Sequence, residues 1–216
     1  MRIHREGWPF IAIFAVINAA LYFGSPWAAL GFLPLTLWCI AFFRDPERTP
    51  PPGENLIVSP ADGKLLPIVE AVPPEELGLG PEPRRRLSIF MNVFNVHVNR
   101  MPVSGTVVAL AYRPGRFINA SFDKASAHNE RMSARVRPAG GQAPDADLAV
   151  VQIAGLVARR IVCDVRQGDA VKRGERYGMI RFGSRLDVYL PPGARIVIED
   201  GSVTRAGVTV LAELQG

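Results

Sequence analysis

The most prominent hydrophobic pattern in the chain is a long run without charge near its start. Residues 7–43 contain no Asp, Glu, Lys or Arg, and Gly24-Ser25-Pro26 divides them into two apolar blocks, Trp8–Phe23 and Trp27–Phe43. A transmembrane helix needs about 20 apolar residues, and about 17 is the lower limit. The pattern therefore predicts a helical membrane anchor over residues 1–44, either a hairpin or re-entrant pair that turns at Gly24, or one long kinked span.

Arginines flank this apolar run on both sides, with Arg2 and Arg5 before it and Arg44 and Arg48 after it. A hairpin would leave both flanks on one side of the bilayer, and the positive-inside tendency favours the cytoplasmic side. The run is too long for a cleaved signal peptide, and no small-residue cleavage site stands out before Arg44. The sequence therefore predicts an anchored chain whose remaining domain faces the cytoplasm.

Beyond a proline-rich linker at residues 45–55, the pattern changes to short apolar runs separated by Gly, Pro and Asp. Asn119–Met132 is the best candidate for a helix in this part of the chain. Runs of this kind predict a mainly β, antiparallel sandwich or barrel-like domain over residues 45–216. The expected strands are Leu56–Ser59, Lys64–Val69, Leu87–Val93, Gly105–Ala111, Leu148–Ile153, Arg160–Asp164, Met179–Phe182, Asp187–Leu190 and Arg195–Ile198.

The composition is that of a folded and basic protein. The 216 residues are 48% hydrophobic despite 19 Pro and 20 Gly, and they carry a formal net charge of +5. A positive excess suits an anionic partner, either an acidic lipid surface or nucleic acid. Two cysteines and three scattered histidines form neither a disulfide framework nor a metal-ligand motif. No metal site is therefore expected.

Three short motifs contain the candidate catalytic residues. Asp62 lies before Gly63 in a predicted tight turn, His97 lies among β-forming residues, and Gly183-Ser184 interrupts two strand-like runs. Each also has a structural interpretation: turn capping for the aspartate, a satisfied core position for the histidine, and a bulge or turn for the Gly-Ser pair. Together Asp62, His97 and Ser184 are the acid, base and nucleophile types of a hydrolase-like triad. Ser184 is not in a Gly-x-Ser-x-Gly elbow.

Two other classes of function stay open from the residues alone. Asp123-Lys124-Ala125 is similar to the modified-lysine site of lipoyl- or biotinyl-type carrier domains, which are small β-sandwiches. The simpler interpretation is a solvated helix with Lys124 paired to a nearby carboxylate. A serine hydrolase would instead use Ser184 directly as its nucleophile.

The order of three motifs resembles phosphatidylserine decarboxylase proenzymes of the short, bacterial and archaeal type. The motifs are Ser59-Pro-Ala-Asp-Gly63, Phe94-Asn-Val-His-Val-Asn-Arg-Met-Pro102 and Phe182-Gly-Ser-Arg-Leu-Asp-Val-Tyr-Leu-Pro191, and the resemblance covers nearly the whole chain. It implies self-cleavage between Gly183 and Ser184 into a large subunit (1–183) and a small subunit (184–216). Ser184 would become a covalent pyruvoyl cofactor, with no metal and no PLP.

The resemblance also implies a substrate and roles for the site residues. The pyruvoyl carbonyl would form a Schiff base with the amine of phosphatidylserine, and loss of CO₂ would give phosphatidylethanolamine. His97 would serve as base in cleavage and as proton donor after decarboxylation, and Asp62 would orient it. The expected location is the bacterial inner membrane.

The implied partners are phosphatidylserine and anionic membrane lipids, with no nucleic acid. The two subunits are expected to stay associated, and a homo-oligomer is compatible with the resemblance. Arg84-Arg85-Arg86, Arg181 and Arg185 are candidates to meet anionic head groups, although surface arginines are more often just solvated. Two positions depart from the family pattern: Arg100 stands where longer bacterial members carry a second histidine, and Arg185 stands where Ser or Thr is frequent. Because Arg185 lies outside the scissile pair, cleavage is expected to survive.

Overall fold

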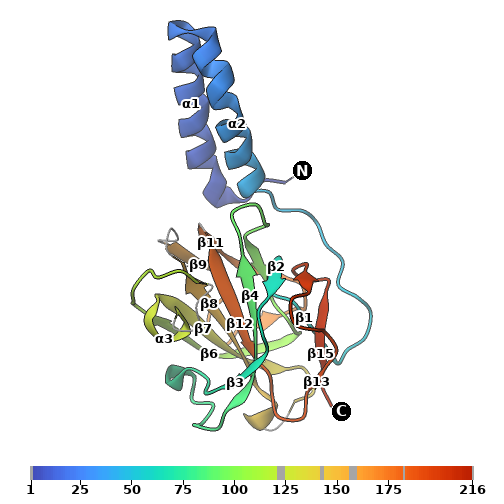
Figure 1. Cartoon of the computed structure of the whole chain (residues 1–216). Coiled ribbons are helices and arrows are strands. Elements are labelled where there is room, and N and C mark those ends of the chain that lie inside the picture. The colour runs from blue at the N-terminus through green and yellow to red at the C-terminus, as the bar shows by residue number, and fades with distance from the viewer. Residues whose placement is uncertain (1, 121–124, 142–143, 156–159, 182, 216) are drawn as a thin grey trace.

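A computed structural model places a helical hairpin against one end of a β-domain (Figure 1). The structure describes all residues except 1, 121–124, 142–143, 156–159, 182 and 216. A 3-10 turn, η1 (Arg5–Gly7), leads into α1 (Trp8–Gly24), and α2 (Pro26–Phe42) returns to the domain. Ser25 between the helices is extended, with φ −159° and ψ 119°. Proline at the first position of α2 suits a helix start because its missing N–H needs no partner there.

The hairpin is apolar on its outer surface, while one hydrogen-bonded polar side chain, that of Asn18, lies between its helices. Arg5–Gly24 is long and apolar enough to cross a membrane, and only 6% of its most apolar window is buried. Between the helices, the Asn18 Nδ2 donates to the carbonyl of Ala29 at 3.2 Å and to Thr36 Oγ1 at 3.5 Å. This inversion of the usual polarity is typical of helices packed in lipid. The large apolar side chains exposed on the hairpin include Trp8, Ile13, Val16, Tyr22, Phe23, Trp27, Leu30 and Leu37.

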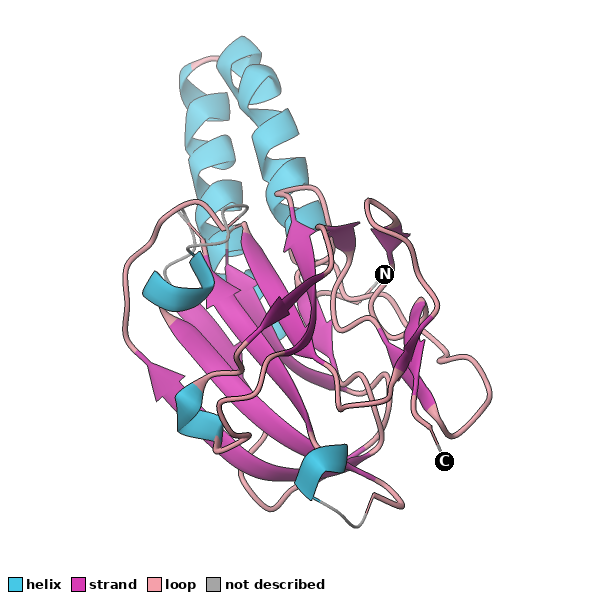
Figure 2. Cartoon of the chain, turned by 60° about the horizontal axis from the view of Figure 1, so that its bottom comes forward, coloured by secondary structure: helices cyan, strands magenta, loops and turns pink. Residues whose placement is uncertain are grey.

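The rest of the described chain is mainly antiparallel β-structure, which confirms the predicted fold class. A nine-stranded sheet has the order β10-β6-β7-β8-β12-β4-β2-β14, with β3 paired to β4, and it curls around the core (Figure 2). Two three-stranded sheets have the orders β5-β11-β9 and β1-β15-β13. The strands of the first half are β1 (Leu56–Val58), β2 (Gly63–Leu65), β3 (Val69–Ala71), β4 (Arg84–Met91), β5 (Val98–Arg100), β6 (Gly105–Arg113) and β7 (Arg131–Pro138). Those of the second half are β8 (Leu148–Ala154), β9 (Arg160–Cys163), β10 (Ala170–Val171), β11 (Arg176–Arg181), β12 (Ser184–Tyr189), β13 (Arg195–Ile196), β14 (Val203–Thr204) and β15 (Val210–Glu213).

The helix predicted over Asn119–Met132 is wrong for most of its described residues. Among these, α3 (Ala125–His128) is helical, and Arg131–Pro138 forms strand β7 between β6 and β8. Arginine and serine alternate with apolar residues along this strand, which is the period-two pattern of a sheet. Lys64–Val69, predicted as one strand, is divided between β2 and β3 around Pro67.

Strand β12 lies in the middle of the large sheet, between β4 and β8. Its side chains alternate, so Leu186 and Val188 point into the main hydrophobic core while Arg185 and Asp187 point to the opposite face. Burying an aliphatic side chain of this size stabilises a fold by roughly 1.5–3 kcal/mol. Pairing with β4 on one side and β8 on the other fixes the register of β12 from its first residue.

The linker that leaves α2 is fixed along the domain by arginines (Figure 1). The Arg176 Nε donates to Asp45 Oδ1 at 2.7 Å, Arg100 donates to the Pro46 carbonyl at 2.8 Å, and Arg173 donates to the Pro51 carbonyl at 2.8 Å. Proline has no backbone N–H with which to pair in a sheet. The linker is held instead by arginine side chains that donate to its backbone carbonyls. The linker thus ties the hairpin to the β-domain.

Candidate active site

Ser184, the predicted nucleophile, is the first residue of β12. It lies opposite Met91 of β4 and Ala154 of β8, and its residue is fully buried. Its Oγ has no hydrogen-bond partner among the described residues. A buried hydroxyl without a partner costs free energy, and such groups are uncommon outside functional positions. The Ser184 hydroxyl therefore does not make the turn-capping hydrogen bond of the simpler interpretation.

The carbonyl of the preceding Gly183 points at another glycine. Gly183 has a φ of +66°, in the left-handed region that favours glycine. A Cβ built on Gly155 would lie 2.2 Å from the Gly183 carbonyl oxygen. Gly155 thus leaves room for the carbonyl of the predicted scissile bond. Sequence reasoning missed Gly155, because a glycine after a strand is most simply interpreted as a turn.

His97, the predicted base, is buried beneath the helical hairpin. Its Nδ1 lies 3.0 Å from the Asn95 carbonyl oxygen, so this nitrogen carries the proton and donates it. The Nε2 is left as an acceptor and has no partner among the described residues. The pKa of His97 is lowered from 6.5 to about 4, mainly by burial, which outweighs the upward effect of the hydrogen bond to the Asn95 carbonyl; the charge of Arg44 lowers the pKa and that of Asp62 raises it by smaller amounts. The imidazole is therefore neutral near pH 7, with a lone pair free to accept a proton.

Sheet topology brings His97 and Ser184 to the same end of the domain. Strand β4 ends at Met91, opposite Ser184, and the loop of residues 92–97 then leads to His97. His97 is followed by Val98 of β5, which lies opposite Met179 of β11. The structure gives no hydrogen bond between the serine hydroxyl and the imidazole. This end of the sheets faces the base of the hairpin (Figure 1).

Two buried amide side chains connect β8, which pairs with β12, to β5, the strand that follows His97. The Gln152 Nε2 donates to Asn99 Oδ1 at 2.9 Å, and the Asn99 Nδ2 approaches Met91 Sδ at 3.8 Å. Gln152 belongs to β8, two residues before the partner of Ser184, while Asn99 follows His97 by two residues. Sequence reasoning missed both, since no local pattern links positions so far apart.

Asp62, the predicted orienting acid, is held by groups other than His97. Its carboxylate accepts from both terminal nitrogens of Arg48, one of them at 2.7 Å, and from the Ala206 N–H at 2.8 Å. The imidazole Nδ1 is instead bonded to Asn95. Asp62 acts on the histidine as a nearby negative charge that raises its pKa. Arg48 belongs to the linker that follows the hairpin, so the ion pair also connects Asp62 to that linker.

The face of the sheet opposite Ser184 carries a cluster of buried charges. The Arg185 Nε lies 2.8 Å from Asp187 Oδ1, and the Ser126 hydroxyl donates to Asp187 Oδ2 at 2.8 Å. Arg185 also donates to the Ala120 carbonyl at 3.2 Å. A buried ion pair therefore braces the strand behind the predicted cleavage site.

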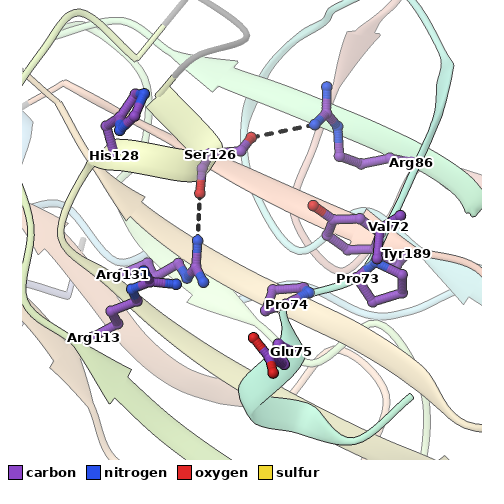
Figure 3. A pocket seen from close by; sticks show the side chains of 10 residues that line it. All are labelled: Val72, Pro73, Pro74, Glu75, Arg86, Arg113, Ser126, His128, Arg131 and Tyr189. Carbon is purple, nitrogen blue, oxygen red and sulfur yellow. Dashed lines mark hydrogen bonds between the residues drawn. The ribbon is translucent and has the colours of Figure 1, made fainter. Parts of the chain in front are cut away.

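Arg84, Arg86 and Arg185, three of the arginines considered for contact with lipid head groups, are buried rather than on the surface. Arg84 donates to the Asp147 carbonyl at 2.6 Å, and Arg181 pairs with Glu6 at the hairpin base at 3.3 Å. A cavity of about 550 Å³ opens on the face opposite Ser184 (Figure 3). Its lining is Val72, Pro73, Pro74, Glu75, Arg86, Arg113, Ser126, His128, Arg131 and Tyr189.

The other candidate groups contribute nothing to the described contacts of Ser184 and His97. Lys124, the carrier-type lysine, lies outside the described residues. His4 caps η1 by accepting from the Glu6 N–H, and His128 is exposed at the cavity. Within the described residues, no group of three or more His, Cys, Asp or Glu side chains is placed to hold a metal ion.

The low pKa of His97 predicts a loss of stability in acid. Between pH 6.5 and about 4 the unfolded chain binds a proton at this histidine and the folded chain does not, so the free energy of unfolding falls as pH falls. At about 1.4 kcal/mol per pH unit, the loss is about 3 kcal/mol. Urea unfolding at several pH values should show this slope in the native chain and a smaller one in His97→Gln. Equal slopes in both proteins would remove the histidine as the cause.

Comparison with known proteins agrees with the motif order. The profile of the family described as phosphatidylserine decarboxylase matches residues 35–212. A protein of Cereibacter sphaeroides named phosphatidylserine decarboxylase proenzyme is 57% identical over 214 residues, 98% of this chain and 90% of the relative. Proteins of the same name from Paramagnetospirillum magneticum and Ruegeria pomeroyi are 53% and 54% identical, over 98% and 99% of this chain and 87% and 95% of their own lengths. The chain therefore belongs to the phosphatidylserine decarboxylase family.

Proposed function

We propose that this chain is a self-processing, pyruvoyl-dependent phosphatidylserine decarboxylase that produces phosphatidylethanolamine and CO₂ at a membrane. The observation that carries the proposal is the buried, unpartnered hydroxyl of Ser184, directly after a glycine whose carbonyl is held against Gly155. Family membership and the word proenzyme in the relatives' names agree with it. Here Ser184 carries an intact serine side chain, so the geometry is that of the uncut precursor.

Cleavage begins with the Ser184 hydroxyl. Its Oγ adds to the Gly183 carbonyl carbon as it loses its proton, and the peptide C–N bond breaks to leave an ester. Loss of the Ser184 Cα proton then releases the Gly183 carboxylate and leaves a dehydroalanine. Water hydrolyses that residue to a pyruvoyl group and ammonia. The neutral Nε2 of His97 is the proton acceptor that the geometry offers at this end of the sheet.

The position of Ser184 also fits a residue that becomes a new chain end. After cleavage, residues 184–216 keep their pairing, because β12 lies between β4 and β8, β14 pairs with β2, and β15 pairs with β1. The small subunit therefore stays bound to the large one. The pyruvoyl group would supply the carbonyl that condenses with the substrate amine as a Schiff base and accepts the electrons released with CO₂.

The hairpin supports a membrane location for this chemistry. Each helix has 17 residues, a length of about 25 Å at 1.5 Å per residue, against about 30 Å for a bilayer core. Its exposed side chains are apolar, which water would not favour over so large a surface. Both ends of the hairpin meet the β-domain (Figure 1), so the domain lies on one side of the bilayer. With Arg2, Arg5, Arg44 and Arg48 at that side, we place it on the cytoplasmic face of a bacterial inner membrane.

The direct test is the intact mass of the purified protein under denaturing conditions, followed by CO₂ release from phosphatidylserine. Two chains that separate after Gly183, the smaller without a free amino terminus, would support the proposal. A single chain of 23.6 kDa with no release of CO₂ would contradict it. Covalent labelling of Ser184 in that chain by a serine-directed phosphonate would favour a hydrolase instead.

Asp62→Asn is expected to slow self-cleavage by less than about tenfold, the change that one pKa unit in the base would give, because Asp62 has a small effect on the pKa of His97. The amide still accepts from the Ala206 N–H but no longer provides the charge that raises the pKa of His97. A pulse-chase time course on denaturing gels measures the rate. Arg48→Met is the control, because it breaks the same ion pair and keeps the carboxylate. Cleavage at the native rate in Asp62→Asn would make Asp62 purely structural.

A further inference from the structure

The last residue of the apolar hairpin lies on the predicted base. Phe42 ends α2, and its ring stacks on the His97 imidazole with centroids 4.1 Å apart and planes inclined by 29°. Both residues are fully buried. A stacked ring at this distance restricts the tilt of the imidazole and keeps water from its face. The anchor therefore contacts the site directly.

The surrounding contacts fix this arrangement from both sides. The base of the hairpin and the β-domain share one hydrophobic cluster. After the helix, Arg44 donates to the Phe94 carbonyl at 2.7 Å, within the loop that carries His97. The His4 N–H donates to the Phe43 carbonyl at 2.9 Å, so the start of the chain closes over the end of α2. The buried members of the cluster are Cys39, Phe42, Phe43, Val96, Val98 and Met179.

The electrostatic environment of His97 depends on the same contact. Two charged side chains act on its pKa: Arg44, which follows the hairpin and lowers it, and Asp62, from the turn before β2, which raises it. Burial has the largest effect, and it lowers the pKa. The Phe42 ring supplies part of that burial because it covers one face of the imidazole.

We propose that Phe42 is a positioning residue for His97, so that the hairpin is a wall of the active site as well as an anchor. The proposal rests on the role of His97 in the proposed function, and it assigns to the hairpin a part in the chemistry. The stacked ring holds the imidazole with Nδ1 on the Asn95 carbonyl and Nε2 available. Binding of the protein to its membrane and orientation of its base are then properties of one structural unit.

The neighbouring phenylalanine provides a matched control. Phe43 is equally buried in the same cluster; its ring stacks on Phe10, with centroids 5.5 Å apart, and meets the Phe42 ring edge-on, with centroids 5.0 Å apart. Phe42→Leu and Phe43→Leu therefore remove similar rings from the same cluster, and only the first removes the ring on His97. Both replacements keep an apolar side chain, so both variants are expected to fold.

The test is a pH titration of the full chain in detergent, with ¹⁵N-labelled histidine observed by NMR. The chain has three histidines, and His97→Gln assigns the signal. Phe42→Leu is expected to raise the pKa of His97 by about one pH unit, a tenfold change in proton affinity, because water reaches the imidazole. Phe43→Leu is expected to leave it unchanged. In the pH profile of the decarboxylation rate, the fall at low pH should shift with the pKa of His97 in Phe42→Leu and should stay unchanged in Phe43→Leu.

The titration needs no enzymatic activity, so it separates this proposal from the proposed function. If the native chain neither cuts itself nor releases CO₂, the proposed function fails while the titration still tests the contact. A native titration curve in Phe42→Leu would overturn the positioning role. An equal shift in Phe43→Leu would also overturn it, since burial of the whole cluster would then be the cause.

Discussion

Ser184→Ala is expected to leave a single chain of 23.6 kDa that releases no CO₂ from phosphatidylserine. The hydroxyl is both the nucleophile for cleavage and the source of the cofactor atoms, so no other side chain can replace it. The variant should fold normally, because the Oγ that it loses is buried without a partner among the described residues. Removing an unsatisfied polar atom costs little stability. Intact mass and a CO₂ assay on the same preparation measure both effects.

Ser88→Ala is the control for this prediction. Ser88 lies on β4 in the same sheet, it is buried, and its hydroxyl also lacks a partner among the described residues. It lies opposite Asp187, on the face of the sheet away from the cleavage site. This variant should cut itself and decarboxylate at native rates. Cleavage after Gly183 in Ser184→Ala would instead show that another nucleophile is used.

The sequence predicted the elements whose signal is local. The two apolar blocks form α1 and α2, and these helices end within one residue of the predicted Phe23 and Phe43. A long run without charge, divided at a proline and followed by an arginine, favours helices over any other structure. The run Leu148–Ile153 becomes β8 because all its residues except Gln152 are apolar, on both faces, as in a central strand. Around α3 the prediction was wrong, since pairing of β7 with β6 and β8 outweighed a weak helical period.

The contacts of the site could not be predicted in this way. Motif order singled out Asp62, His97 and Ser184, and the structure brings the last two to one end of the sheets. Asp62 is paired with Arg48, which belongs to a linker without a strand pattern. His97 is stacked on Phe42, which belongs to a helix whose composition predicts a membrane anchor. Such contacts depend on how the hairpin packs against the β-domain. The hydrophobic period of a single segment carries no information about that packing.

Gly155→Ala is expected to slow self-cleavage by at least about a hundredfold, the effect of displacing a reacting atom by about 1 Å. The new Cβ would lie 2.2 Å from the Gly183 carbonyl oxygen, a distance that forces the backbone to move. The atom displaced belongs to the carbonyl that the Ser184 hydroxyl must attack. A pulse-chase time course measures the rate, and thermal unfolding reports whether the fold persists.

Gly105→Ala separates this positional effect from general damage to the sheet. A Cβ there would lie 2.0 Å from the Arg137 carbonyl oxygen, an equally severe clash in the same sheet on strand β6. It should therefore lower stability and leave cleavage near the native rate. If both variants slowed cleavage equally, disturbance of the sheet would explain both. If only Gly155→Ala does so, the rate of maturation is limited by where the Gly183 carbonyl is held, and Gly155 sets that position by having no side chain.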